Sequence, residues 1–369
     1  MVTESNAFDI DTPAILIDLD RVEKNLATMQ KKADAFSALL RPHIKAHKIP
    51  ELARAQVRLG AVGITASKVS EAEVMADAGI KDIFIANQIV TPIKLKRLAA
   101  LSKRVNISVG LDSVFGAKIL SDVFSAAKEK IDYVIEIDSG LNRCGVQPGL
   151  PAVELFSAIK QLTGLRFKGI FTHAGQVYGK QTFEDVLEIS KLESETMVKT
   201  CNCFKDVGVL PEVVSVGSTP TMRVWEGCAG VNEIRPGNYI FLDAIQIALG
   251  VATPQECALT VLATVTSRPA HDRAVVDAGS KVFALDKGAH GKEMLKGFGI
   301  VLNKKAVLER LSEEHGVMSL DYKEKLEIGE TVRIIPNHAC PVVNLARELV
   351  VLDGPSMDVY AVDAAGCVR

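Results

Sequence analysis

The chain has 369 residues, of which 48% are hydrophobic and 24% charged, and its formal net charge is −2. This composition predicts a folded protein with a sizeable core, and it argues against disorder and against a surface for nucleic acid or anionic membranes. No membrane-length apolar run or signal-peptide pattern is present and the seven cysteines are scattered, so we expect a cytoplasmic protein without a disulfide framework.

Short β-rich runs alternate with amphipathic, helix-like stretches over the first two-thirds of the chain. The predicted strands are 14–17, 39–44, 63–66, 83–85, 106–109, 133–137, 167–172 and 213–216. Nearly continuous apolar strands that alternate with helices predict a parallel sheet covered by those helices. Eight such units fit a (β/α)8 TIM-type barrel over residues 12–245. A doubly wound sheet is the alternative, because periodicity alone does not close a barrel.

The pattern changes after about residue 245. Strand-like runs at 259–265, 274–277, 331–335 and 349–352 follow one another with few helices between them. This predicts a mostly β domain over residues 246–369. We expect residues 1–11 to join this second domain.

The segment 41–48, RPHIKAHK, holds five basic or imidazole side chains directly after an apolar strand. In a barrel, that end of the strand opens on the active-site face. A free lysine titrates near ~10.4. Crowding by the other four groups would lower the pKa of Lys45 and favour a reactive neutral amine. A solvated basic turn is the alternative interpretation.

Other strand ends carry groups suited to an anionic ligand. The candidates are Arg143, His173, Tyr178, Gly217, Ser218, Thr219, Arg235, Gly237 and Asn238. An arginine held between glycines can reach an anionic oxygen, and a Gly/Ser/Thr turn suits a phosphate. Barrel phosphate sites often lie near the last two strands, where 216–221 and 233–239 fall. Ordinary strand–helix turns, and a structural histidine, are the alternatives.

His338 and Cys340 form a candidate metal pair in the β-rich domain. On a strand, residues two apart face the same side, so the imidazole and the thiolate can point at one metal ion. Nitrogen and sulfur ligands suit zinc, and two protein ligands leave room for water and substrate. A buried cysteine beside a surface histidine is the alternative.

Together, these segments resemble the D-serine dehydratase/D-threonine aldolase group of pyridoxal 5'-phosphate (PLP) enzymes, which have an alanine-racemase-like fold. The resemblance runs from Thr12-Pro13 to the His338/Cys340 pair. It implies that Lys45 carries PLP as a Schiff base and that Arg143 lies near the phenolic oxygen. The other implied positions are His173 and Tyr178 beside the ring, Gly217, Ser218, Thr219, Gly237 and Asn238 at the phosphate, and His338 and Cys340 at the metal.

Arg235 stands where alanine racemases have an arginine that bonds the pyridine nitrogen, although dehydratases and aldolases often have another residue there. The resemblance also implies a homodimer, a small D-amino acid as substrate, and Zn²⁺, with Mn²⁺ or another divalent cation as the alternative metal.

Two features favour D-serine dehydratase, which forms pyruvate and ammonia. The metal pair is His with Cys where aldolases usually have His with Asp, and 218–221 reads STPT where they tend to have a glycine-rich turn. A freed Lys45 would take the Cα proton. The alternatives are cleavage of the D-threonine aldolase type with His173 as a base, an amino-acid racemase, and a non-catalytic PLP-binding protein.

Overall fold

Eight parallel strands form the first of two sheets in the computed structural model, which describes residues 10–289 and 293–369. They are β2 (Leu39–Leu40), β3 (Ile64–Ala66), β4 (Asp82–Gln88), β5 (Asn106–Leu111), β6 (Ile131–Ile137), β7 (Leu165–Thr172), β8 (Val213–Val216) and β9 (Glu233–Ile234). The sheet order is β2-β9-β8-β7-β6-β5-β4-β3, and an isolated parallel bridge between His43 and Thr65 joins its two edges. The sheet thus curls into a barrel, which confirms the predicted fold class.

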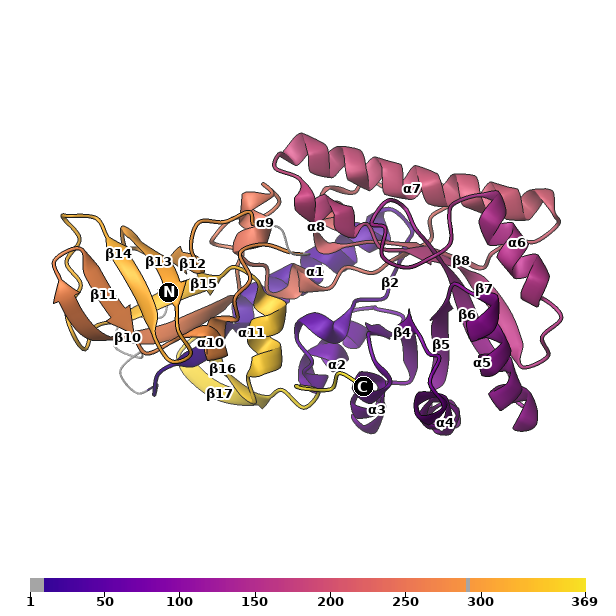
Figure 1. The fold of residues 1–369 in the computed structure, drawn as a ribbon, viewed down its shortest axis with the longest axis horizontal. Coiled ribbons are helices and arrows are strands. Elements are labelled where there is room, and N and C mark those ends of the chain that lie inside the picture. Colours follow the sequence, from indigo (N-terminus) through magenta and orange to yellow (C-terminus); the bar gives the residue numbers. More distant parts are fainter. Residues whose placement is uncertain (1–9, 290–292) are drawn as a thin grey trace.

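Helices cover the outside of this barrel (Figure 1). They are α1 (Leu19–Ala35), α2 (Pro50–Arg58), α3 (Val69–Asp77), α4 (Pro92–Leu101), α5 (Val114–Ala126), α6 (Leu150–Ile159), α7 (Phe183–Asp206) and α8 (Thr219–Val224). The side chains of Asp18, Ser113 and Thr182 accept hydrogen bonds from first-turn backbone N–H groups, so polar residues fix where α1, α5 and α7 begin. Strand β6 is buried along its whole length, as a strand packed on both faces requires.

The strand predicted at 14–17 does not belong to the barrel, so that assignment was wrong. It forms β1 (Ala14–Asp18), which pairs antiparallel with β10 (Leu259–Ala270) and parallel with β16 (Glu348–Asp353). The eighth barrel strand is β9 instead. An apolar strand fits the interior of either sheet, and its periodicity does not say which neighbours it pairs with. Residues 1–9 of the segment expected to join the second domain lie outside the described residues, and β1 makes that connection.

The second sheet has nine strands in the order β11-β14-β13-β12-β15-β10-β1-β16-β17. Its remaining strands are β11 (Arg273–Val276), β12 (Gly299–Val301), β13 (Ala306–Leu311), β14 (Gly316–Leu320), β15 (Thr331–Pro336) and β17 (Ser356–Ala361). The four runs predicted here as strands correspond to β10, β11, β15 and β16. The strands β12, β13, β14 and β17 were not predicted from the sequence; β12 has only three residues, and β17 is almost entirely exposed and so lacks an apolar pattern.

Short helices lie where the two parts of the chain meet. The helix α9 (Ala244–Ala248) spans the predicted boundary at residue 245, and α10 (Ser280–Phe283) and α11 (Ala339–Leu345) belong to the second domain. Figure 1 shows α11 between the nine-stranded sheet and the barrel.

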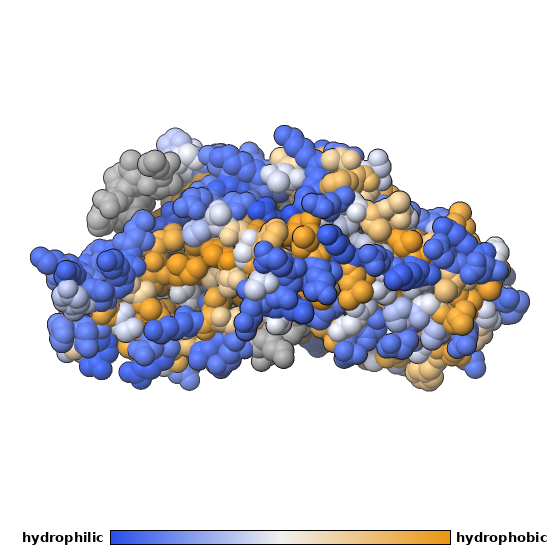
Figure 2. All heavy atoms as spheres, turned by 90° about the horizontal axis from the view of Figure 1, so that it is seen from above, coloured by the Kyte–Doolittle hydropathy of each residue, from blue (hydrophilic) through white to orange (hydrophobic). Residues whose placement is uncertain are grey.

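The surface mixes polar and apolar residues. Figure 2 shows polar and charged residues over much of one face, with apolar residues exposed between them. Within residues 10–289 and 293–369, no helix combines the length and the hydropathy that a membrane crossing needs.

Candidate active site

All twelve residues that the sequence analysis singled out line one cavity of about 560 Å³. They are Lys45, Arg143, His173, Tyr178, Gly217, Ser218, Thr219, Arg235, Gly237, Asn238, His338 and Cys340. The volume falls within the roughly 300–1,000 Å³ of small-molecule sites. The barrel residues follow the carboxyl ends of β2, β6, β7, β8 and β9, where barrel enzymes carry out their chemistry.

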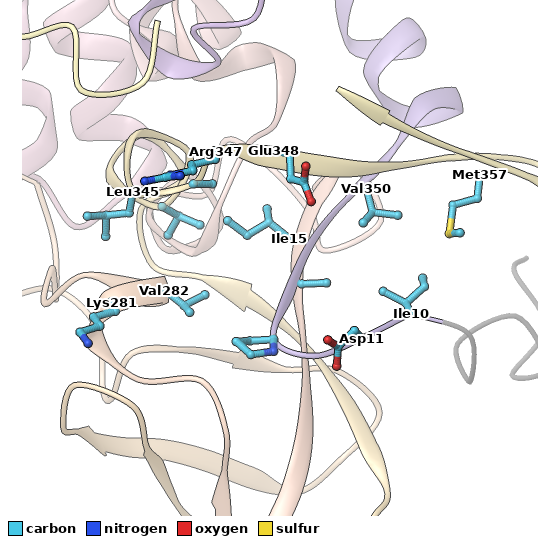
Figure 3. Close-up of a pocket in the computed structure, with 14 residues that line it drawn as sticks. Ile10, Asp11, Ile15, Lys281, Val282, Leu345, Arg347, Glu348, Val350 and Met357 are labelled. Carbon is cyan, nitrogen blue, oxygen red and sulfur yellow. The ribbon is translucent and has the colours of Figure 1, made fainter. Parts of the chain in front are cut away.

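A second cavity of about 470 Å³ lies in the other domain, between β1, β16 and α11 (Figure 3). Its lining includes Ile15, Leu345 and Glu348 but none of the twelve candidate residues. The cavity at the mouth of the barrel is therefore the candidate active site.

Lys45 lies in a single 3-10 turn, Ile44–Ala46, shortly after β2 ends at Leu40. Its side chain opens onto the cavity, and its backbone N–H donates to Nδ1 of His43, with 3.3 Å between the two nitrogens. Burial is the largest cause that lowers the pKa of Lys45, and the charges of Arg143 and Arg235 act in the same direction. The direction of the predicted shift is thus correct.

Its predicted cause is only partly right, because two of the charged groups of the 41–48 segment, Arg41 and Lys48, are engaged elsewhere. Arg41 pairs with Asp82 and Glu233, which are the first residues of β4 and β9 and lie at the opposite end of the barrel. Lys48 forms a buried ion pair with Glu71, with Nζ 2.9 Å from the carboxylate oxygen. His43, by contrast, lines the same cavity as Lys45, and the charge of Lys45 is one of the causes that lower the pKa of His43.

Two glycines shape the end of the cavity formed after β8 and β9. Gly217 has a φ of +133°, and a Cβ there would lie 2.9 Å from the backbone nitrogen of Arg235. A Cβ on Gly237 would lie 3.2 Å from the carbonyl oxygen of His43. The Ser218 side chain caps α8 by accepting from the N–H of Thr221. The backbone of this turn therefore packs closely against the neighbouring backbone, as a phosphate cradle requires.

His173 and Tyr178 lie beside this turn. Nδ1 of His173 lies 3.2 Å from the carbonyl oxygen of Gly217. A carbonyl only accepts, so Nδ1 carries the proton, and Nε2 is the basic nitrogen of the neutral ring. Burial raises the pKa of the Tyr178 phenol, which also has a hydrogen bond with Gln246. Tyr178 therefore stays protonated at neutral pH.

Arg235 is held rigidly inside the barrel. Its guanidinium donates to the Ser215 hydroxyl and to the carbonyl of Thr172, and it lies 5.0 Å from the centre of the Phe171 ring. Burial lowers its pKa, and the charge of Glu233 is the largest of the opposing effects. The site thus contains a fixed positive charge beside Lys45.

The metal pair is not arranged as the sequence analysis expected. The strand β15 ends at Pro336, His338 is the N-cap of α11 and Cys340 lies in its first turn. The two side chains converge because of this helix start and not because of strand alternation, which was the wrong reason. Nδ1 of His338 lies 3.3 Å from the Asp286 carboxylate, an arrangement typical of metal-binding histidines.

Several residues in or near the cavity were not predicted from the sequence. Ser67, Asn87 and Gln88 follow or end the neighbouring strands β3 and β4. The rule that parallel strand ends share one edge could have found them. Glu136, at the end of β6, accepts from Gln88, and burial raises its pKa. No sequence pattern pointed to Asp243 and Asp286, because only the tertiary structure brings them to the metal pair.

Asp112, Glu136 and Cys144 also bring potential ligand atoms within 4.8 Å of one another. Asp112 accepts from the backbone N–H of Gly145, and Glu136 is bonded by Gln88. Asp112 thus supports the turn that carries Arg143, whereas the Glu136 carboxylate is engaged by the end of β4.

Family models match both parts of the chain. Residues 17–244 match the family "alanine racemase, N-terminal domain", and residues 258–352 match "putative serine dehydratase domain". D-threonine aldolase of an Arthrobacter species is 33% identical and covers 98% of this chain and 94% of its own. D-threo-3-hydroxyaspartate dehydratase of a Delftia species is 35% identical, covering 90% and 91%. D-serine dehydratase of Dictyostelium discoideum is 30% identical, also covering 90% and 91%.

Solved structures agree over nearly the whole chain. D-threonine aldolase from Filomicrobium marinum has a TM-score of 0.87 at 36% identity and covers 98% of this chain and 97% of its own. Two variants of D-threo-3-hydroxyaspartate dehydratase have TM-scores of 0.90 and 0.89 at 33% identity, covering 96% of this chain and 95% and 98% of theirs. One has alanine for a histidine, and the other, in the metal-free form, has alanine for a cysteine two positions later. The chain therefore belongs to the alanine-racemase-like, fold-type III family of PLP enzymes that includes D-threonine aldolase and D-serine dehydratase.

Proposed function

We propose that this protein is a PLP- and metal-dependent dehydratase of a small β-hydroxy D-amino acid, with D-serine as the first candidate substrate. The observation that carries the proposal is the His338/Cys340 pair in the same cavity as Lys45. The spacing of the pair equals that of the histidine and cysteine replaced in the two dehydratase variants, of which the cysteine variant is metal-free.

The residues present fit PLP. The cavity offers the Lys45 amine, whose pKa is lowered by burial, and the turn at Gly217 leaves no room for a Cβ. Lys45 would hold the cofactor covalently, the Gly217–Thr219 turn with Gly237 and Asn238 would hold its phosphate, and Arg143 would lie at its phenolic oxygen. When bound, PLP withdraws electrons from the Cα of the substrate.

The residues also fit a divalent metal. His338 and Cys340 supply nitrogen and sulfur, and the Asp286 carboxylate can orient the imidazole. Zinc is the metal that this donor set favours, and at this place it would polarise the β-hydroxyl oxygen as a Lewis acid.

Three side chains of the cavity would have separate roles in proton transfer and substrate binding. A neutral Lys45 amine, once released, can take the Cα proton, which its lowered pKa favours. The proton on Nδ1 of His173 is committed to Gly217, so any proton that this ring exchanges must use Nε2. Arg235 keeps a positive charge in the cavity wall, where it favours an anionic substrate.

A product assay tests this proposal. Purified protein with PLP and ZnCl₂ is incubated separately with D-serine, D-threo-3-hydroxyaspartate and D-threonine. We expect a 2-oxo acid and equimolar ammonia from a β-hydroxy D-amino acid, with loss of turnover on chelation and in Lys45→Ala. The variant His338→Ala should lose turnover but keep the visible absorbance of PLP on Lys45. Neither a 2-oxo acid nor ammonia from any of the three substrates would refute dehydration.

Aldol cleavage is the second candidate, favoured by the 33% identity to D-threonine aldolase over 98% of this chain. In that reaction the base would remove the hydroxyl proton, and His173 or a neighbouring residue is the candidate for that base. Glycine plus an aldehyde in the same assay, without ammonia, would establish cleavage instead of dehydration.

A further inference from the structure

Asp243 is a fully buried carboxylate that connects the two halves of the candidate site. It is the N-cap of α9, and its Oδ1 accepts from the backbone N–H of Gln246 at 3.2 Å. Its Oδ2 accepts two further hydrogen bonds, from Nδ2 of Asn238 at 2.6 Å and from the backbone N–H of Ala339 at 2.9 Å.

These two donors come from different parts of the chain. Asn238 belongs to the proposed phosphate end, in the short 3-10 helix Asn238–Ile240 after β9, whereas Ala339 lies between His338 and Cys340 at the start of α11. A parallel link runs beside them, because the N–H of Ile245 donates to the carbonyl of Asn337 at 3.2 Å. One carboxylate oxygen therefore holds the Asn238 side chain and the backbone of the metal pair in fixed relative positions.

The donor and acceptor roles of these groups make the placement of one loop depend on the placement of the other. A carboxylate only accepts, so the Asn238 amide must present Nδ2 to it, and the placement of that amide depends on the placement of Asp243. A metal ion on His338 and Cys340 would hold the first turn of α11, and with it the Ala339 N–H. Leaving a buried carboxylate short of a donor is costly, so ordering one loop favours the ordered form of the other.

We propose that Asp243 is a positioning residue that couples the two ligands, so that a metal ion at His338/Cys340 tightens the binding of PLP and PLP tightens the binding of the metal. This inference rests on the proposed function, because it takes the metal and the cofactor to bind where that function places them. Thermodynamic linkage requires both affinities to change by the same factor.

Binding titrations test the coupling without measuring turnover. The dissociation constant of PLP is measured from its visible absorbance on Lys45, with saturating ZnCl₂ and with a chelator. The dissociation constant of zinc is measured by competition with a chelating dye, with and without PLP. In the wild type we expect each ligand to tighten the other by the same factor, about fivefold or more. In Asp243→Asn both ligands should still bind, but each should tighten the binding of the other by a factor of only about two or less.

Controls separate coupling from a general loss of structure. Asp18→Asn alters another N-cap carboxylate, on α1. It should leave unchanged the factor by which PLP and zinc tighten each other's binding. Should Asp243→Asn fail to fold, Asp243→Ser keeps a capping oxygen but is too short to reach both Asn238 and Ala339. In His338→Ala, zinc should no longer affect PLP.

Three results would overturn the inference: independent binding in the wild type, a wild-type factor in Asp243→Asn, or a persistent zinc effect in His338→Ala. If the wild type fails to bind PLP at Lys45 or zinc at the pair, the proposed function itself is refuted, and this inference with it.

Discussion

Glu193 shows how a buried side chain behind the site can matter as much as those that line it. It lies on α7, is fully buried, and accepts from the backbone N–H of Gly217 at 2.7 Å. Burial raises its pKa to about 7, against the opposing effects of the Gly217 hydrogen bond and the Arg235 charge. As with Lys45, desolvation has more effect than neighbouring charges.

A pH dependence of stability follows from this carboxyl group. Its pKa in the folded state lies above the ordinary value of 4.5, so the protonated form is favoured by folding. The stability that the protonated Glu193 side chain contributes to the folded protein is fully present below about pH 4.5. This stability is lost as the pH rises through about 7. We expect the wild type to lose up to about 3 kcal/mol of unfolding free energy over this window relative to Glu193→Gln.

Denaturant unfolding of both proteins at pH 5 and pH 8 measures this difference. The glutamine keeps an oxygen that can accept from Gly217 but does not titrate, so it isolates the charge. A difference between the two proteins that is the same at both pH values would contradict the prediction.

At the scale of elements, the turns after the strands determine the site. Gly217 follows β8 directly, and its φ of +133° is closed to residues with a side chain. Gly208, after α7, also has a positive φ, of +76°, but a Cβ there would meet nothing within 4 Å. Both glycines therefore have a positive φ, but only at Gly217 would an added Cβ collide with neighbouring atoms.

We expect Gly217→Ala to weaken PLP binding about tenfold or more, because the added Cβ must displace the backbone at Arg235. Gly208→Ala should cost stability through its φ while leaving PLP affinity unchanged. Absorbance titration of both variants distinguishes them, and equal PLP affinities would show that this turn does not hold the cofactor.

At the scale of the whole molecule, β1 and α1 tie the two domains together. The strand β1 lies between β10 and β16 in the second sheet, and α1 follows it without a break. On α1, Nδ2 of Asn25 donates to the carbonyls of Ile240, at 3.1 Å, and Glu256, at 3.0 Å. One continuous hydrophobic core includes residues of both sheets.

This continuity predicts that a defect in β1 also destabilises the barrel. Ile17→Ala, at a position with 0% exposure, should cost about 2–5 kcal/mol. Circular dichroism and the fluorescence of the single tryptophan, Trp225, next to α8 of the barrel, should shift to lower denaturant together. Leu285→Ala, at a residue that is 65% exposed, is the matched control. An unshifted tryptophan transition would mean that the domains unfold independently.

The sequence by itself determined the barrel, its β-rich partner and the positions after strands where polar groups gather. These follow from local pattern, because apolar periodicity fixes strand and helix type, and parallel strands share their carboxyl edge. The glycines of the phosphate-end turn and the lysine after β2 were visible for the same reason.

Only the tertiary structure decided how these groups act on one another. Burial is the largest cause that lowers the pKa of Lys45, and a helix start and not a strand aligns His338 with Cys340. The bond from Ala339 to Asp243 joins residues 96 positions apart, and β1 pairs across the chain with β10 and β16. Desolvation and long-range pairing depend on what packs against a residue, and local sequence does not contain that information.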